Sequence, residues 1–294
     1  MLDVILDAVI DSLKVFGVAL LIFVVFSLIE EKVTRFLTKR RKNQPIIGAA
    51  CGLIPQCGIS VVAADLYKSR LITSGTLLAV FFACSDEALP ILLTDGEKLI
   101  YIIPLLVIKF IGGFSLGYLI DAFLKEKEEL VEEIVPVANL EESKISKHLI
   151  HPLLHSFKIF LYVLIINFLF GIIIFYTGEE VLIDFLKVNK YLTPLLTVIF
   201  GLIPNCASSA LMSELFIRNG LPFGALVTGL CTNAGLGMIY LLKFKEERVK
   251  GLSLIGILML YSLIIGYVII LIMELIGWKK FMMRQLKPLI INNL

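Results

Sequence analysis

Two adjacent carboxylates stand out in this sequence because they lie inside an apolar stretch. Asp86 and Glu87 occur in Cys84-Ser85-Asp86-Glu87-Ala88-Leu89-Pro90, and the segment 71–93 around them carries no other charge. Carboxylate oxygens bind Mn²⁺, Mg²⁺ or Ca²⁺, and acids inside apolar segments commonly mark ion or proton paths. In a regular helix the two side chains point about 100° apart, so both reach one cation only where the helix is broken. Pro90 favours a break because it removes the backbone hydrogen bond to the carbonyl of Asp86; the alternative is that both acids end a shorter helix in water.

A nine-residue motif occurs twice in the chain. Gly52-Leu53-Ile54-Pro55-Gln56-Cys57-Gly58-Ile59-Ser60 returns 149 residues later as Gly201-Leu202-Ile203-Pro204-Asn205-Cys206-Ala207-Ser208-Ser209. Without any gap, the same offset pairs Asp65 with Glu214 and Gly75 with Gly224. Internal repeats in a chain with several membrane segments are typical of secondary transporters, whose substrate site lies near mid-membrane where the repeats meet.

The prolines of this motif predict interrupted helices. Pro55 and Pro204 remove the backbone hydrogen bonds to the carbonyls of Cys51 and Phe200, respectively. Irregular backbone at membrane depth is tolerated only where protein or a water-filled cavity satisfies it, so we expect the freed carbonyls to line a site. A simple Gly-Pro kink is the alternative, but two copies in register favour paired broken helices. The helix breaks and polar residues predicted from the motif are Gly52, Pro55, Gly201 and Pro204, with Gln56, Cys57, Asn205, Cys206 and Ser208 binding the substrate.

The second repeat offers different chemistry where the first has its acids. The corresponding stretch is Asn233-Ala234-Gly235-Leu236-Gly237, which contains no acid, and Asn233 falls opposite Cys84 at the same offset. We therefore expect an asymmetric site. Asp86 and Glu87 are the metal ligands from the first repeat, Pro90 is a further helix break, and Cys84 and Asn233 complete the substrate-binding set.

All five cysteines lie in these interrupted segments, and no CxxC pair occurs. Cys57 and Cys206 match across the repeats, and thiolates bind soft metals or trivalent metalloids. Cys51 and Cys231 are interpreted as small apolar residues of the packing. Oxygen and sulfur ligands are both present, so the residues leave the choice between metal and metalloid open.

A lysine also lies inside an apolar segment. Lys109 belongs to the stretch 99–120, where a charge is unusual. Two interpretations are open. The side chain pairs with Asp86 or Glu87, or it snorkels to the membrane surface.

The elements that position these residues are membrane helices. The 294 residues are 58% apolar and 18% charged, with a mean hydropathy of +0.93, whereas ordinary globular domains are about half apolar and about a quarter charged. The surplus apolar surface predicts an all-α polytopic membrane protein in a lipid bilayer. Its net charge of +2 excludes a nucleic-acid partner, and no cofactor is expected.

Eight apolar segments approach the roughly 20 residues that a spanning helix needs. They run from 9–29, 45–64, 71–93, 99–120, 157–176, 191–212, 221–242 and 251–276.

A polar linker at 121–156 divides the chain into a first transmembrane repeat, 1–120, and a second, 157–294. Charge indicates how the repeats are oriented. Residues 30–44 carry a net plus four, whereas the equivalent residues 179–193 carry minus one.

In a second pair of equivalent loops the second half carries the positive charge: residues 94–101 have a net charge of minus one, and residues 243–250 have a net charge of plus two. Under the positive-inside rule, equivalent loops then lie on opposite sides of the membrane, and the repeats are inverted. Inversion needs an odd number of crossings per repeat, so one segment of each is re-entrant or splits into two short helices. The Gly-Pro segment is the candidate.

With these motifs, the chain resembles a family of prokaryotic membrane proteins described as ten-helix heavy-metal exporters, some labelled arsenic efflux proteins and others manganese transporters. The resemblance rests on the twin GLIPxC motifs, SDEALP and the polar middle loop, and it covers essentially the whole chain. It implies a ten-helix, multi-pass permease of the cytoplasmic membrane that moves metal or metalloid outward; the eight apparent segments become ten if both Gly-Pro segments split. The family motif falls on Pro55, Gln56, Cys57, Asp86, Glu87, Pro204, Asn205 and Cys206.

The function we expect is a secondary exporter of a divalent heavy-metal ion, manganese, driven by exchange with protons or another ion through Asp86 and Glu87. A rival keeps the fold but exports arsenic species through Cys57 and Cys206. An intramembrane thiol or aspartyl enzyme is a further rival, but CxxC, HExxH, a nucleophile elbow and a P-loop are all missing from the sequence, so we expect a transporter and no enzyme. The sequence leaves homo-oligomerisation open.

Overall fold

The computed structural model describes residues 43–55, 57–84, 88–124, 191–203, 206–243 and 248–275, together with single positions between 13 and 168. Within these residues every regular element is a helix, which confirms the predicted all-α membrane protein. Most of the apolar segments 9–29 and 157–176, and almost all of the linker 121–156, lie outside the described residues. Four stretches are long and apolar enough to cross a membrane, namely Ser74–Leu93, Leu99–Leu124, Phe223–Leu242 and Arg248–Leu275.

The helices of the two halves have matching bounds. The first half contains α3 (Gln44–Gly52), α4 (Cys57–Lys68), α5 (Ser74–Ala83), α6 (Ala88–Leu93), the short 3₁₀-helix η2 (Leu99–Tyr101) and α7 (Ile102–Leu124). The second half contains α10 (Thr193–Gly201), α11 (Cys206–Ile217), α12 (Phe223–Thr232), α13 (Leu236–Lys243) and α14 (Arg248–Leu275). The bounds of α10, α11 and α12 are those of α3, α4 and α5 shifted by the 149 residues that separate the sequence motifs.

Each Gly-Pro segment forms two short helices. In the first half they fold back as a hairpin, because Gln44 at the start of α3 donates through Nε2 to the carbonyl of Leu71, just after α4, at 3.1 Å. The hairpin therefore enters and leaves at one level of the molecule, one of the two arrangements expected from the sequence. Arg70 and Asn219 end α4 and α11 in the same left-handed conformation, with φ of 55° and 58°. The helix ends of the two halves thus match in conformation as well as in position.

The start of α5 is fixed by two capping side chains. Thr73 Oγ1 accepts the Thr76 N–H at 3.0 Å, as an N-cap residue should. Asp121, near the end of α7, accepts the Gly75 N–H at 3.0 Å and the Thr73 hydroxyl at 3.0 Å. A carboxylate stabilises a helix N-terminus, so the end of α7 is held beside the start of α5.

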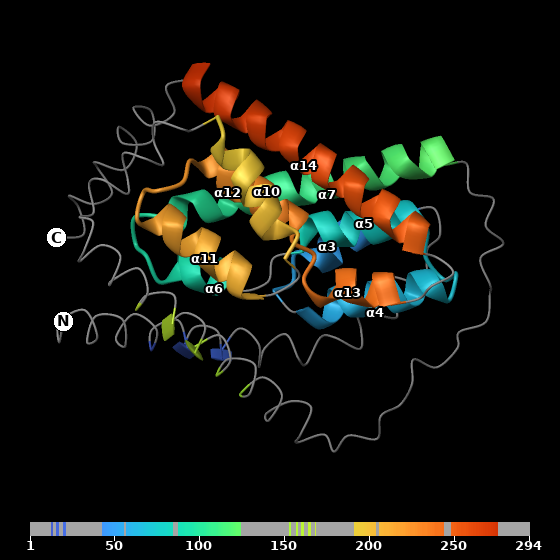
Figure 1. The fold of residues 1–294 in the computed structure, drawn as a ribbon, viewed down its shortest axis with the longest axis horizontal. Helices are drawn as coiled ribbons and strands as arrows, with labels where there is room; N and C mark the ends of the chain where they lie inside the picture. The colour runs from blue at the N-terminus through green and yellow to red at the C-terminus, as the bar shows by residue number, and fades with distance from the viewer. Residues whose placement is uncertain are drawn as a thin grey trace.

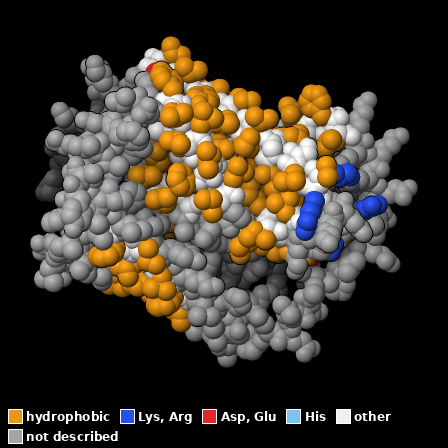
Figure 2. Space-filling view, in the orientation of Figure 1, with side chains coloured by type: hydrophobic (Ala, Val, Ile, Leu, Met, Phe, Trp, Pro, Cys, Tyr) orange, Lys and Arg blue, Asp and Glu red, His pale blue; other side chains and the backbone are white. Residues whose placement is uncertain are grey.

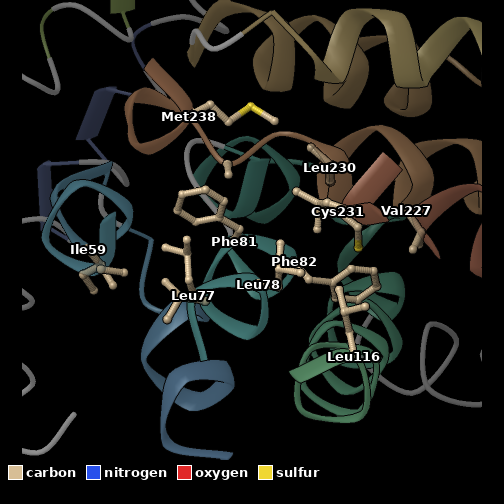
Figure 3. Packing of buried hydrophobic residues seen from close by; sticks show 14 of the residues in the cluster. Ile59, Leu77, Leu78, Phe81, Phe82, Leu116, Val227, Leu230, Cys231 and Met238 are labelled. Carbon is tan, nitrogen blue, oxygen red and sulfur yellow. The ribbon is translucent and has the colours of Figure 1, made fainter. Parts of the chain in front are cut away.

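The helices α5 and α12 form the centre of the molecule. Every residue of both helices is buried, as expected for helices that are apolar all round. Helix α5 packs against α3 and α7, and α12 packs against α10 and α14. Figure 3 shows residues of α5 and α12, among them Phe81, Phe82, Leu230 and Cys231, in one apolar cluster.

Glycines allow close helix crossings at matching places. A Cβ added to Gly75 would lie 2.1 Å from the carbonyl oxygen of Gly117, and one added to Gly224 would lie 2.5 Å from that of Gly266. Both distances are far below an ordinary contact, so α5 meets α7, and α12 meets α14, backbone to backbone. Small residues commonly allow such an approach between membrane helices.

The long helices α7 and α14 run in opposite directions (Figure 1). Ser115 Oγ lies 2.6 Å from the Tyr261 hydroxyl, and Gly112 lies against Ile265. Residue numbers of the contacts therefore decrease along α7 as they increase along α14, as in an antiparallel pair. At one end of the molecule α4 contacts α13, and at the other end α11 contacts α6. Each of these pairs joins one half of the chain to the other.

The outer faces of α7 and α14 are apolar. Large exposed side chains include Ile103, Val107, Ile111, Leu119, Phe123, Leu252, Leu260, Ile264, Val268 and Leu271. Figure 2 shows hydrophobic side chains across this face and Lys and Arg side chains at one end of it. Arg248 and Lys250, at the start of α14, are exposed. An apolar band with basic residues at one end is typical of a lipid-facing surface.

Candidate functional site

The hairpin tips turn tightly after each Gly-Leu-Ile sequence. In the first half, the Ile54 N–H donates to the carbonyl of Cys51 at 3.1 Å. In the second, the Ile203 N–H donates to the carbonyl of Phe200 at 3.1 Å. The expectation that the prolines leave these two carbonyls without a partner is therefore wrong, because the amide three residues on replaces the missing bond; that the carbonyls line a site stays a prediction. Pro55 is buried at the end of the first turn.

Several predicted residues of the tips lie outside the described residues. They are Gln56, Pro204 and Asn205, together with the side chains of Cys57 and Cys206. The backbone places Cys57 and Cys206 as the first residues of α4 and α11, at matching positions. Their role as ligands stays a prediction.

The membrane-spanning stretch with the acid pair is broken. Helix α5 ends at Ala83, Cys84 leaves it with φ −52° and ψ 125°, and α6 begins at Ala88. Asp86 and Glu87 belong to this interruption and lie outside the described residues, so their predicted role as metal ligands stays a prediction. Pro90 is buried in the first turn of α6, where a proline is tolerated.

The matching stretch of the second half is also broken. Helix α12 ends at Thr232, and Gly235 has a φ of 57°, which a residue with a side chain rarely adopts. Asn233 Nδ2 donates to Ser208 Oγ at 2.9 Å, and Asn233 Oδ1 accepts the Gly235 N–H at 2.9 Å. Ser208 donates in turn to the carbonyl of Ile203 at 3.2 Å. The structure thus brings together Ser208 and Asn233, two residues predicted from the sequence.

Each hairpin tip lies beside the interruption of its own half. A Cβ added to Gly52 would lie 2.6 Å from the carbonyl oxygen of Val80 and 2.9 Å from Ala83 Cβ. In the second half, a Cβ added to Gly201 would lie 2.5 Å from the Gly229 carbonyl oxygen and 3.0 Å from Thr232 Cβ. Gly52 and Gly201, predicted as helix breaks, are therefore required by packing at the breaks.

Two further contacts join the interruptions of the two halves. Gly237 at the start of α13 lies so close to Ser60 of α4 that an added Cβ would be 2.6 Å from the Ser60 carbonyl oxygen. Lys109 donates through Nζ to the carbonyl of Cys84 and, at 3.3 Å, to the carbonyl of Leu230. All four interruptions therefore surround one region at the middle of the molecule.

Lys109 has described partners in this region that the sequence did not predict. Its side chain is fully buried, with a relative exposure of 0%, so of the two interpretations left open the snorkelling one is wrong. Its described partners are backbone carbonyls, which leave no trace in a sequence. The alternative, a pairing with Asp86 or Glu87, concerns residues outside the described ranges.

The described side chains alone do not form a metal centre. Within the ranges that the structure covers, no three His, Cys, Asp or Glu side chains come together in a way that could hold a metal ion. Cys51, Cys84 and Cys231 are buried thiols without a disulfide. Cys51 and Cys231 pack in the apolar cluster, as expected, whereas Cys84 meets Lys109 through its carbonyl.

Hydrogen bonds join the two halves on either side of this region. Tyr240 of α13 donates to Asp65 Oδ1 of α4 at 2.6 Å. Lys98, before η2, donates to Asn219 Oδ1, after α11, at 2.6 Å, and its ammonium group lies 5.0 Å from the ring centre of Phe216. The Tyr240–Asp65 bond lies at the α4–α13 pair, and the Lys98–Asn219 bond lies at the α11–α6 pair.

Residues 1–170 match the model of a family described as "Putative, 10TM heavy-metal exporter". No curated protein and no solved structure matches the chain. The family match covers more than half of the 294 residues, so the chain belongs to this heavy-metal exporter family.

Proposed function

We propose that this member of the heavy-metal exporter family is a secondary transporter that moves Mn²⁺ out of the cell by exchange with protons or another ion, and that Asp86 and Glu87 bind the metal. The observation that carries the proposal is the position of the break between α5 and α6. The backbone leaves the helix at Cys84, within a stretch long and apolar enough to span a membrane, and the two acids follow Cys84 closely in the sequence.

Burial at the edges of this break favours an internal site. Cys84 before it and Ala88 after it have relative exposures of only 2% and 1%. A connection that ended a short helix in water would have exposed edges. A carboxylate at membrane depth needs a positive partner, because an unpaired charge there costs about 2.5 to 3.5 kcal/mol on insertion scales. A transported divalent cation is such a partner, and oxygen ligands suit Mn²⁺.

We further propose that the two halves are inverted repeats in the cytoplasmic membrane of a prokaryote. The matching helix bounds, the opposite directions of α7 and α14, and the reciprocal α4–α13 and α11–α6 pairs support this arrangement. The basic loops 30–44 and 243–250 then face the cytoplasm. Repeats that meet around a central site can expose it alternately to the two sides, which is how secondary transporters work.

Export of arsenic species through Cys57 and Cys206 is the second candidate function. It is supported by the matching positions of the two cysteines at the first residues of α4 and α11, next to the hairpin tips. Paired thiolates suit a trivalent metalloid better than Mn²⁺. This candidate shares the fold and differs only in the ligands.

Transport by the full chain in proteoliposomes tests the first proposal. The native chain is compared with Asp86→Asn and Glu87→Gln for Mn²⁺, Co²⁺, Zn²⁺ and arsenite. Loss of one carboxylate ligand should slow Mn²⁺ transport about tenfold or more, since about 1.4 kcal/mol of lost binding is a factor of ten. Glu97→Gln, an acid in the exposed turn before η2, is the matched control and should transport Mn²⁺ at the native rate. Native-like Mn²⁺ transport by both site variants would exclude the proposed ligands.

Serine substitutions separate the two candidates. If Cys57→Ser and Cys206→Ser abolish arsenite transport and leave Mn²⁺ transport intact, the substrate of the second candidate is also carried. Cys51→Ser, a buried thiol of the α3 packing, is the control for loss of a sulfur atom. Arsenite transport that survives both changes would rule out the thiol site.

A further inference from the structure

A charged side chain is enclosed between the two halves of the chain. Lys109 lies in the middle of α7, and its relative exposure is 0%. An ammonium group at this depth can be accommodated only where polar groups replace its water. The structure provides them from α5 and α12, which belong to different halves.

The two acceptors are both helix ends. Cys84 is the C-cap residue of α5, and Leu230 lies in the last turn of α12, which ends at Thr232. The last four carbonyls of a helix have no partner within the helix and carry the negative end of its dipole. The ammonium group of Lys109 therefore lies at the C-terminal ends of two broken helices.

The equivalent position in the second half has no charge. The 149-residue offset pairs Lys109 with Leu258 of α14, which is also fully buried, with a relative exposure of 0%. One lysine thus serves the C-terminal ends of both α5 and α12. A single cation shared by two equivalent helix ends is the arrangement of an ion site between repeats, with a side chain in place of the ion.

We propose that the C-terminal ends of α5 and α12 form a site for a monovalent cation, and that Lys109 fills this site with its own ammonium group. The acceptors among the described residues are neutral carbonyls, which suit a cation of single charge and of the size of ammonium or K⁺. The tethered cation holds the two helix ends together and makes the central region independent of a dissolved monovalent ion. The proposal concerns binding and stability and does not rest on the identity of the exported metal.

Thermal unfolding of the purified full chain in detergent tests this site. The variant Lys109→Ala removes the tethered cation and leaves space for a free one. Unfolding midpoints are compared in choline chloride, whose cation is too large to enter, and in ammonium, methylammonium, potassium and sodium chloride at one ionic strength. Lys109→Ala should be less stable than the native chain in choline. Ammonium, methylammonium or K⁺ should raise its midpoint by about 3 to 10 °C, the shift expected at roughly ten to a hundred times Kd.

Two controls distinguish a cation site from loss of packing. Leu258→Ala makes a comparable gap at the equivalent position of α14 and should be destabilised equally in every salt. Lys109→Met keeps most of the side-chain volume without the charge, and it should be destabilised without recovery because the methionine fills the space. The native chain should show the same midpoint in all five salts.

The proposal is overturned if Lys109→Ala responds to the small cations no more than Leu258→Ala does. It is also overturned if Lys109→Ala cannot be purified in any of the salts while Leu258→Ala can, because a site that accepts a small cation would fill during extraction. Failure of metal transport by the native chain would leave these results unaffected, so the two proposals fail separately.

Discussion

The crossing of α12 and α14 at Gly224 allows a quantitative test of the packing. In Gly224→Ala the new Cβ would lie 2.5 Å from the carbonyl oxygen of Gly266 and 2.6 Å from Ile270 Cγ1. Carbon–oxygen contacts are ordinarily about 3.3 to 3.6 Å, so the two helices must separate by roughly 0.8 to 1 Å. A gap of that size removes about a quarter to a half of the dispersion energy of each atom pair across it.

The expected loss of stability follows from overpacking at a backbone contact. Such insertions typically cost about 1 to 3 kcal/mol. Each kcal/mol shifts the unfolding midpoint of a domain of this size by about 2 to 4 °C, so Gly224→Ala should unfold about 2 to 12 °C below the native chain. The equivalent Gly75→Ala, whose Cβ would lie 2.1 Å from the Gly117 carbonyl oxygen, should lose at least as much.

The measurement is thermal unfolding of the full chain in detergent, with Gly256→Ala as the control. Gly256 lies on α14 itself, and an added Cβ meets nothing within 4 Å. Alanine favours a helix over glycine by about 0.5 to 1 kcal/mol, so this variant should be slightly more stable than the native chain. Equal midpoints for Gly224→Ala and Gly256→Ala would refute the close crossing.

Two further substitutions test the polar contacts. Asn233→Leu removes the partner of Ser208 Oγ and of the Gly235 N–H, both inside the protein, and should lower stability by about 1 to 3 kcal/mol with slower Mn²⁺ transport in proteoliposomes. Tyr240→Phe removes the 2.6 Å hydrogen bond to Asp65 and should lower the unfolding midpoint by a few degrees, with faster hydrogen exchange in α4.

Each of these has a control on an exposed position. Ser253→Ala on α14 removes a side-chain oxygen that faces outward, and Tyr118→Phe on α7 removes a hydroxyl from a side chain that is 38% exposed. Both should keep the native midpoint. An Asn233→Leu chain as stable as Ser253→Ala would show that the network at the α12–α13 break contributes nothing.

Much of the helical framework could be predicted from the sequence. Apolar runs located the long helices, since the predicted segment 251–276 corresponds to α14 at Arg248–Leu275. The repeated Gly-Pro motif located the interruptions after Gly52 and Gly201. These predictions succeed because helix length and proline act locally, within one turn of the chain.

The contacts of the backbone could not be predicted in the same way. Proline shows which i−4 bond is missing, but whether the Cys51 carbonyl stays free depends on the turn that follows, and the Ile54 amide takes it. The carbonyl partners of Lys109 could not be predicted for a related reason. Its partners are carbonyls of residues distant in sequence, and a carbonyl is present at every residue, so no residue type marks it.

The glycine crossings have a mechanical consequence for the whole molecule. Within each half, helices that touch through their backbones cannot move closer together, so we expect α5 with α7, and α12 with α14, to move as rigid pairs. The contacts between the halves at the two ends of the molecule include side-chain hydrogen bonds, Tyr240–Asp65 at one end and Lys98–Asn219 at the other. A hydrogen bond between side chains breaks more easily than a backbone-to-backbone crossing separates, so the halves can part at one end while they stay joined at the other.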